Sequence, residues 1–350
     1  MQSLLHTYRR YRTLKDDVIH ALPIAILMPH SSCNCRCVMC DIWKDNKNAK
    51  ELTLSDVEQL MGSLKKLGTR QVLLSGGEAL LHSNFFRLCD ILHTQKIHIT
   101  LLSTGLLLKK HAAALVDSVD DIIVSLDGNE ALHNSIRNIP GAFEKLAEGI
   151  AALRSIRKGF PVSGRTVIHA LNYREWPAII DTAARIGLDH ISFLPADVSS
   201  TAFNRETPWD SSRQQEILIP KEQLPVLEEI IEYIIQRYAA EFESHFIAES
   251  PDKIRKIYSY YAAQHGLVAF PWKACNAPWV SAVIEADGTV RPCFFHEATG
   301  NIHKESLEEA VNGEKALQFR RELDMSRNAT CMKCVCSLYL PPFADPRPGN

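Results

Sequence analysis

Two groups of cysteines are the residues in this sequence with the clearest potential for chemistry. Four of the ten cysteines lie between Cys33 and Cys40, and three more lie between Cys331 and Cys336. Structural cysteines scattered along a chain would not gather in this way, and in a reducing compartment they are not expected to form disulfides. Because soft thiolates select zinc, copper(I) or iron–sulfur clusters, the grouping predicts metal centres.

The first group has the spacing C-x3-C-x2-C, formed by Cys33, Cys37 and Cys40. A structural zinc ion takes four ligands, whereas three thiolates suit a four-iron cluster whose fourth iron stays open for a small molecule. Cys35 is a possible fourth thiolate, but its place between two ligands makes that geometry awkward. Zinc stays an alternative on spacing alone.

Glycine and polar residues follow three apolar segments further along the chain. They are Ser75-Gly76-Gly77-Glu78, Ser103-Thr104-Gly105 and Ser125-Leu126-Asp127-Gly128, with Arg137 downstream. Glycine lets the backbone approach a ligand closely. A carboxylate accepts hydrogen bonds from an ammonium group, and a guanidinium fits a carboxylate through two parallel bonds. Each segment alone could be a surface turn, but their order, each after an expected strand, indicates one ligand site.

The elements that would position these residues alternate between strands and helices. Aliphatic runs predict strands at 24–28, 71–74, 98–102, 122–126, 162–168 and 191–194, and helical spacing predicts helices at 57–67, 84–95, 109–119, 142–156 and 174–186. A capping box at Ser55 and Glu58 would begin the first of these helices. The alternation predicts a parallel sheet with the site at the carboxyl ends of its strands. Six strands are too few for a full eight-fold barrel, and both an open sheet and a partial barrel fit the pattern.

Together these motifs resemble the radical S-adenosylmethionine (SAM) superfamily, with Met39 where the family often has an aromatic residue. The resemblance implies an α/β fold, a partial (β/α)6 TIM-like barrel. It also implies a [4Fe–4S] cluster on the first three cysteines, whose open iron binds SAM, cleaves it reductively and yields a 5′-deoxyadenosyl radical. The residues implied to bind SAM are Ser75, Gly76, Gly77 and Glu78 at the methionine amine, Ser103 and Thr104 at the ribose or methionine, Ser125, Arg137 near the carboxylate, and Leu194 at the adenine.

The second cysteine group extends over the C-terminal part of the chain. Cys275, Gly288 and Cys293 form C-x12-G-x4-C, and Cys331 and Cys334 form C-x2-C. This pattern resembles the SPASM/twitch extension, in its shorter form, and implies one auxiliary [4Fe–4S] cluster on Cys275, Cys293, Cys331 and Cys334. Cys336 could replace Cys334, and His296 is a possible ligand. A four-cysteine zinc site fits the spacing equally well. Four protein ligands would leave no iron of this cluster open to the substrate. Beside the pocket, such a cluster would accept an electron from a product radical.

Four units are expected along the chain. They are an N-terminal helical extension (1–23), a radical SAM core (24–197), a helical connection (198–270) containing a long helix over 221–246, and an auxiliary cluster domain (271–350). In the last unit, Asp287-Gly288 predicts a hairpin turn. The catalytic acid or base is left open, with Asp127, Arg165, His169 and Asp197 as candidates near strand ends.

Composition and domain organisation limit the classes of substrate and partner that we expect. The formal net charge of −2 gives no basic footprint for nucleic acid, and no secretory signal or membrane-spanning run is visible, which predicts a cytoplasmic enzyme without membrane insertion. The first strand starts near residue 24, which leaves no room for a leader-recognition domain and favours a small polar metabolite of sugar, aminocyclitol or nucleoside type. An external electron donor such as flavodoxin or ferredoxin is expected. The alternatives are a peptide or protein maturase with a separate leader-binding partner, and a non-catalytic zinc or iron–sulfur scaffold.

Overall fold

The computed structural model describes residues 4–347, and one mixed sheet runs through them in the order β6-β5-β4-β3-β2-β1-β7-β8-β9. Strands β1 to β6 pair in parallel, and β6 forms one edge, so the barrel stays open. The strands are β1 (Ile24–His30), β2 (Gln71–Gly76), β3 (His98–Ser103), β4 (Asp121–Ser125), β5 (Val162–Ile168), β6 (Ile191–Pro195), β7 (Ser281–Ile284), β8 (Thr289–Arg291) and β9 (Gly300–Asn301). The expected TIM-like partial barrel is confirmed.

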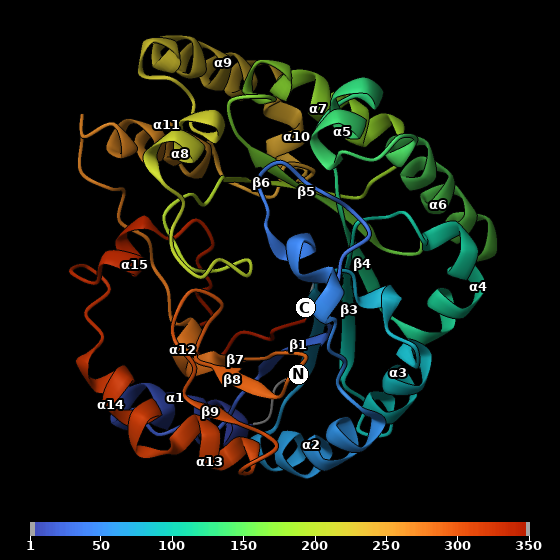
Figure 1. The fold of residues 1–350 in the computed structure, drawn as a ribbon, viewed down its shortest axis with the longest axis vertical. Helices are drawn as coiled ribbons and strands as arrows, with labels where there is room; N and C mark the ends of the chain where they lie inside the picture. Colours follow the sequence, from blue (N-terminus) through green and yellow to red (C-terminus); the bar gives the residue numbers. More distant parts are fainter. Residues whose placement is uncertain (1–3, 348–350) are drawn as a thin grey trace.

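Helices cover the outside of this sheet, as Figure 1 shows for the arc of α2, α3, α4 and α6. The α-helices are α1 (Leu4–Asp16), α2 (Leu54–Leu67), α3 (Phe85–His93), α4 (Leu108–Ser118), α5 (Glu130–Arg137), α6 (Ala142–Ile156), α7 (Trp176–Arg185), α8 (Ser211–Ile217), α9 (Leu224–Arg237), α10 (Ala239–Glu243), α11 (Pro251–Gln264), α12 (Ala277–Val280), α13 (Leu307–Asn312), α14 (Glu314–Glu322) and α15 (Ala329–Lys333). Short 3-10 turns are η1 (Ile42–Asn48), η2 (Ala79–Leu81), η3 (Tyr173–Glu175) and η4 (Lys221–Gln223). The strands are covered by helices on one face and by the barrel interior on the other, so they are mostly apolar. Strand β1, which is buried along most of its length, is an example.

Two of the expected helices differ in detail from the observed ones. The capping box of α2 is formed by Thr53 and Asp56, not by Ser55 and Glu58: the Thr53 amide donates to Asp56 Oδ2 at 2.7 Å and the Asp56 amide donates to Thr53 Oγ1 at 3.1 Å. The long helix expected over 221–246 is broken at Tyr238 (φ −109°, ψ 33°), where α9 ends and α10 begins. The Tyr238 hydroxyl donates to the carbonyl of Pro177, 3.0 Å away, so a tertiary contact accompanies the break.

The C-terminal part of the chain joins the barrel sheet. Strand β7 pairs in parallel with β1, in the register Ile24 to Ser281, and then turns back through Asp287 and Gly288 into β8. Gly288 adopts a left-handed φ of +79°, and its amide donates to the Glu285 carbonyl at 2.9 Å. The expected hairpin is therefore present, and it extends the sheet on the β1 side and leads directly to Cys293.

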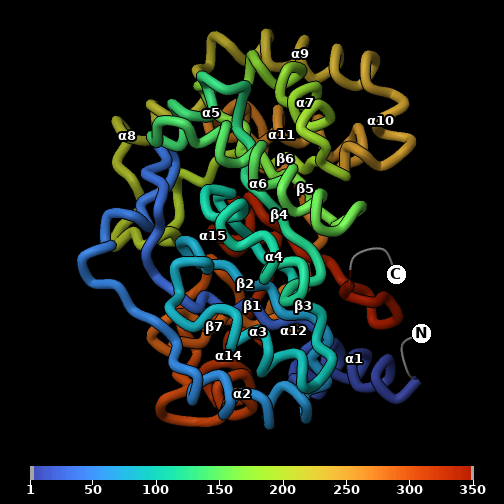
Figure 2. The backbone as a smooth tube through the Cα atoms, turned by 90° about the vertical axis from the view of Figure 1, so that its right-hand side faces the viewer, coloured from blue at the N-terminus to red at the C-terminus, as the bar shows by residue number. Residues whose placement is uncertain are grey.

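The two ends of the described chain also lie together, with α1 beside the C-terminal tail (Figure 2). The buried guanidinium of Arg10 donates to the carbonyls of Leu340 (3.3 Å) and Pro341 (2.7 Å), and Arg70 pairs with Asp345 at 3.2 Å. The N-terminal helix thus packs on the auxiliary region. Within residues 4–347, no helix has both the length and the apolar character needed to cross a bilayer.

Candidate active site

A cavity of about 230 Å³, called here the small cavity, lies at the carboxyl ends of the parallel strands. Most of the residues singled out from the sequence line it. Those residues are Cys33, Cys37, Cys40, Ser75, Gly76, Gly77, Ser103, Thr104, Ser125, Arg137, Arg165, Leu194 and Asp197. Segments after five different strands therefore converge on one space, as expected for parallel strands whose carboxyl ends meet at one edge.

The cysteine loop after β1 is held in place by backbone contacts. The amides of Arg36 and Val38 donate to the carbonyls of Arg137 and Ile136, each at 3.0 Å, and these carbonyls belong to the end of α5. Cys35 is fully buried and is not part of the lining of the small cavity. The lining thus contributes three thiols, a donor set that fits a four-iron cluster with one open iron.

Gly76 and Gly77 bring the end of β2 against this loop. A side chain at Gly77 would place its Cβ 2.1 Å from the carbonyl oxygen of Ser32, and one at Gly76 would lie 2.8 Å from that of His30. Gly76 also has a left-handed φ of +109°. Glycine is required at both positions because the two backbones touch, and the same two residues line the small cavity.

Glu78, which the sequence predicts to bind the methionine amine, is held by hydrogen bonds to the end of β3. Its side chain is fully buried and does not line the small cavity. The carboxylate accepts hydrogen bonds from the Ser103 hydroxyl (3.1 Å) and from both the amide (2.7 Å) and the hydroxyl (2.6 Å) of Thr104. Burial raises the pKa of Glu78, against the effect of these donors. Glu78 therefore joins the ends of β2 and β3, and Ser75, Gly76 and Gly77 are the residues of this motif that line the small cavity.

Replacing Glu78 with glutamine tests this structural role. The amide group of glutamine would turn a donor toward groups that already donate, so we expect Glu78→Gln to lower the free energy of unfolding of the apoprotein by roughly 1–3 kcal/mol. Chemical denaturation under anaerobic conditions measures this free energy of unfolding. Glu51→Gln is the matched control, because Glu51 is a partly exposed carboxylate that accepts from the Ser83 hydroxyl at 2.9 Å. Unchanged stability together with weaker SAM binding would instead mean that the Glu78 carboxylate contacts SAM directly.

Arg137 connects the cysteine loop with a buried carboxylate. Its Nη1 donates to Cys37 Sγ at 3.4 Å, and its Nη2 forms an ion pair with Asp127, whose side chain is fully buried. Burial lowers the pKa of Arg137, but Asp127 and Cys37 outweigh it and raise that pKa above its ordinary value. The thiol of Cys37 therefore lies beside a buried cation, which favours the thiolate form that binds metal.

The four candidate acids and bases fall into two pairs. Arg165 and Asp197 line the small cavity, whereas Asp127 and His169 are fully buried and are absent from its lining. Asp197 is itself paired with Arg205 at 2.7 Å. Of the two that line the small cavity, Arg165 is held by its Nε, which donates to Ser192 Oγ at 3.3 Å.

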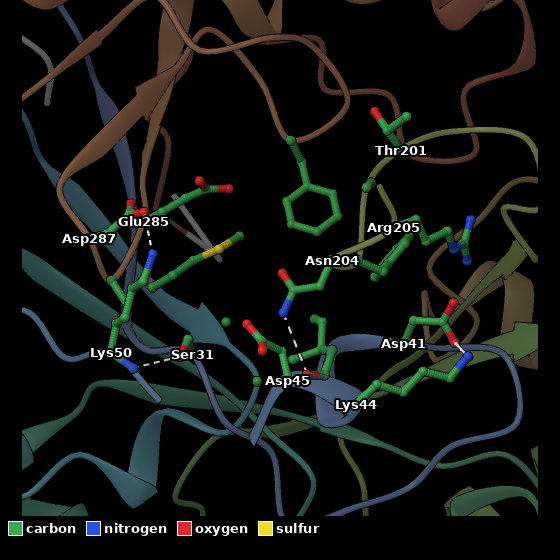
Figure 3. A pocket seen from close by; sticks show the side chains of 18 of the residues that line it. Ser31, Asp41, Lys44, Asp45, Lys50, Thr201, Asn204, Arg205, Glu285 and Asp287 are labelled. Atoms are coloured by element: carbon green, nitrogen blue, oxygen red, sulfur yellow. Dashed lines mark hydrogen bonds and ion pairs between the residues drawn. The ribbon is translucent and has the colours of Figure 1, made fainter. Parts of the chain in front are cut away.

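A larger cavity of about 730 Å³, called here the large cavity, opens beside the small one, and both are lined by Ile42, Gly76, Gly77 and Phe203. Figure 3 shows its charged side chains, which come from the segment after the cysteine motif, from residues 201–206 and from the β7–β8 hairpin. Most are paired: Lys44 with Asp41 (2.8 Å), Lys50 with Asp287 (3.0 Å) and Arg291 with Glu285 (2.8 Å). Sequence reasoning missed these residues, because nothing in their spacing indicates that they meet.

A third cavity of about 340 Å³, called here the C-terminal cysteine cavity, gathers Cys275, Cys293, Cys331, Cys334 and Cys336. The Cys336 amide approaches Cys334 Sγ at 3.4 Å, so these two remain alternatives as the last ligand. Among residues 4–347, no three His, Cys, Asp or Glu side chains are close enough together to hold a single metal ion. The five thiols surround a space that fits a cluster with four protein ligands.

Comparison with known families matches both regions. Residues 27–183 match the model of the radical SAM superfamily, and residues 275–335 match that of the SPASM iron–sulfur cluster-binding domain. The first match contains Cys33, Cys37 and Cys40, and the second contains Cys275, Cys293, Cys331 and Cys334 but ends one residue before Cys336. The cofactors of these domains are SAM, a [4Fe–4S] cluster and auxiliary iron–sulfur clusters.

Individual relatives agree with the family models. An AdoMet-dependent heme synthase of Methanosarcina barkeri is 26% identical over 309 residues, which cover 84% of this chain and 82% of that protein. The subtilosin biosynthesis protein AlbA of Bacillus subtilis is 23% identical over 87% of this chain, but this chain covers only 62% of AlbA. The structure of Streptococcus suis SuiB bound to S-adenosylmethionine superimposes with a TM-score of 0.64 at 14% identity, covering 95% of this chain and 76% of SuiB. That likeness shows a shared fold.

Proposed function

The chain belongs to the radical SAM superfamily and ends in a SPASM iron–sulfur domain, and from this premise we propose that it oxidises or rearranges a small polar metabolite. The metabolite would be of sugar, aminocyclitol or nucleoside type. When bound, the first cluster and SAM supply a 5′-deoxyadenosyl radical that abstracts a hydrogen atom. The remaining steps depend on how this chain binds and orients the two molecules.

The observation that carries the proposal is the contact between the small and large cavities. Four residues, Ile42, Gly76, Gly77 and Phe203, belong to both linings, so a molecule in the large cavity lies next to one in the small cavity. Abstraction of a hydrogen atom requires such proximity. The Lys–Asp ion pairs of the large cavity can form hydrogen bonds with hydroxyl and amino groups. The two charges of each pair balance, so the pairs do not require a charged substrate.

The residues of the small cavity receive roles that follow from their positions. Cys33, Cys37 and Cys40 would hold the first cluster, and the backbone of Gly76 and Gly77 would face the methionine end of SAM. Ser125 and Arg137 line the same cavity and would contact the carboxylate side, while Leu194 at the end of β6 would pack on the adenine. Arg165 would orient the substrate, because it is a cationic side chain in the lining of the small cavity.

A second candidate is the maturation of a peptide. The likeness to AlbA over 87% of this chain supports it. The heme synthase, which matches over most of both chains, supports a small molecule instead. Incubation with candidate metabolites and with candidate peptides separates the two, since only the true substrate is expected to accelerate the formation of 5′-deoxyadenosine.

The test of the central claim is anaerobic incubation of the reconstituted protein with dithionite and SAM. We expect 5′-deoxyadenosine, and about eight irons per chain, as two four-iron clusters require. Zinc without iron, together with no cleavage of SAM, would support the non-catalytic scaffold and refute the proposal that the protein is an enzyme.

We also propose a compartment and an electron donor. All ten cysteines are unpaired, which agrees with a reducing compartment. We propose that the protein acts in the cytoplasm and that flavodoxin or ferredoxin is its electron donor.

Replacing Cys275 tests the role of the auxiliary cluster. If that cluster accepts the electron of a product radical, Cys275→Ala will still form 5′-deoxyadenosine but will form no oxidised product. Product and 5′-deoxyadenosine are quantified together after a fixed time. Cys89→Ala is the matched control, because Cys89 is a buried cysteine of α3 that lines none of the three cavities described above. Equal product formation in the Cys275 and Cys89 variants would refute an electron-transfer role.

A further inference from the structure

A single short segment separates the large cavity from the C-terminal cysteine cavity. Phe294, Phe295 and His296 follow Cys293 directly and line both cavities. The ring of Phe203 packs edge-on against that of Phe294, with 4.9 Å between centroids. These three residues therefore form a wall that the large cavity shares with the C-terminal cysteine cavity.

His296 is the polar residue of the segment, and it contacts a cysteine sulfur. Its Nε2 lies 3.3 Å from Sγ of Cys331, within the distance of a hydrogen bond to sulfur. Its position is fixed from two sides. Nη1 of Arg291 donates to the His296 carbonyl at 3.1 Å, and the imidazole ring packs against Phe319 with 4.8 Å between centroids.

The direction of this hydrogen bond follows from the chemistry of the sulfur. A cysteine that ligates a cluster is a thiolate, which only accepts hydrogen bonds, so Nε2 of His296 must carry the proton. Hydrogen bonds to the sulfurs of an iron–sulfur cluster are among the main determinants of its reduction potential. A donor stabilises the reduced cluster, which carries more negative charge, and so raises the potential.

We propose that His296 is a positioning residue of the auxiliary centre, which donates a hydrogen bond to Cys331 and raises the reduction potential of the cluster held there. The inference rests on the auxiliary cluster of the proposed function and not on the cleavage of SAM. It assigns to His296 a task different from ligation. The side chain acts through Cys331, at the wall that the cluster shares with the large cavity.

An electron paramagnetic resonance titration of the holoenzyme tests the proposal. The signal of the first cluster is recognised by its change on addition of SAM, which leaves the auxiliary signal for measurement. We expect His296→Phe to keep the iron content of the wild type and to shift the auxiliary potential to a more negative value. His296→Gln, which retains an N–H donor, should recover part of the shift. If the phenylalanine variant does not fold, His296→Leu removes the same donor with a smaller side chain.

The control is His303→Asn, because His303 lies in the same region but is half exposed and pairs with Asp56 of α2 at 3.1 Å. Its auxiliary potential should equal that of the wild type. An unchanged potential in His296→Phe would overturn the proposal. Loss of iron from the auxiliary site in that variant would also overturn it, since His296 would then be a ligand. A shifted potential in a protein that fails to cleave SAM would leave the inference intact while removing the proposed function.

Discussion

Replacing any one of Cys33, Cys37 and Cys40 with alanine is expected to reduce the cleavage of SAM to background. Each thiol lines the small cavity, and with two thiols left the first cluster loses a ligand that no other cysteine of the lining replaces. The iron content should fall from about eight to about four atoms per chain, because the C-terminal centre has its own ligands. Iron analysis and quantification of 5′-deoxyadenosine after anaerobic reconstitution measure both effects.

Cys35→Ala is the control for this experiment. Cys35 lies within the same loop and is fully buried, but its thiol is outside the small cavity, and the bond from its amide to Cys33 Sγ at 3.5 Å survives in alanine. This variant should keep nearly all its iron and its cleavage activity. If it loses the iron of the first centre, Cys35 is a fourth ligand, the cluster is closed, and SAM cannot bind to its iron.

The parts of the fold that the sequence predicts are those governed by local pattern. The strand at Val162–Ile168 and the helix at Ala142–Ile156 have the expected bounds, because each has an uninterrupted periodicity of its own. Boundaries set by competition between neighbours are harder to predict. Thr53 caps α2 rather than Ser55 because Asp56 is placed to return the hydrogen bond, and both pairs read alike in the sequence.

The pairing of β7 with β1 was not predictable, because it joins segments more than two hundred residues apart and has no sequence signal. The break at Tyr238 is a second case, because it is accompanied by contacts of the Tyr238 hydroxyl with Pro177 and Asp181 of α7 that the sequence does not show. Long-range contacts decide such features, and periodicity measures only local ones.

The site shows the same division. Motif residues at strand ends converge on the small cavity, because the carboxyl ends of parallel strands share one edge. Side-chain direction was not predictable from those positions. Glu78 belongs to a glycine-rich motif and yet turns to Thr104, while Asp127 follows β4 and yet is buried against Arg137. The charged residues that line the large cavity come from segments far apart in the sequence, and their spacing does not predict that they meet.

The buried pair of Arg137 and Asp127 leads to the second large expected effect. Arg137→Met would leave the Asp127 carboxylate fully buried without its cation, and removing one partner of a buried pair typically costs roughly 3–5 kcal/mol of stability. Chemical denaturation of the apoprotein, without clusters or SAM, measures this loss. Arg255→Met is the control, because Arg255 pairs with Glu232 at 2.7 Å on the surface, where such pairs contribute roughly 0–1 kcal/mol.

The double variant Asp127→Asn with Arg137→Met separates the stability of the fold from the needs of the site. Asparagine keeps the acceptor that the Val167 amide approaches at 3.4 Å but carries no charge, so most of the lost stability should return. SAM cleavage should not return with it, because the guanidinium that lines the small cavity and donates to Cys37 is still missing. A double variant as unstable as Arg137→Met would show that the cost lies in lost packing. A double variant that cleaves SAM at the wild-type rate would show that Arg137 serves the fold alone.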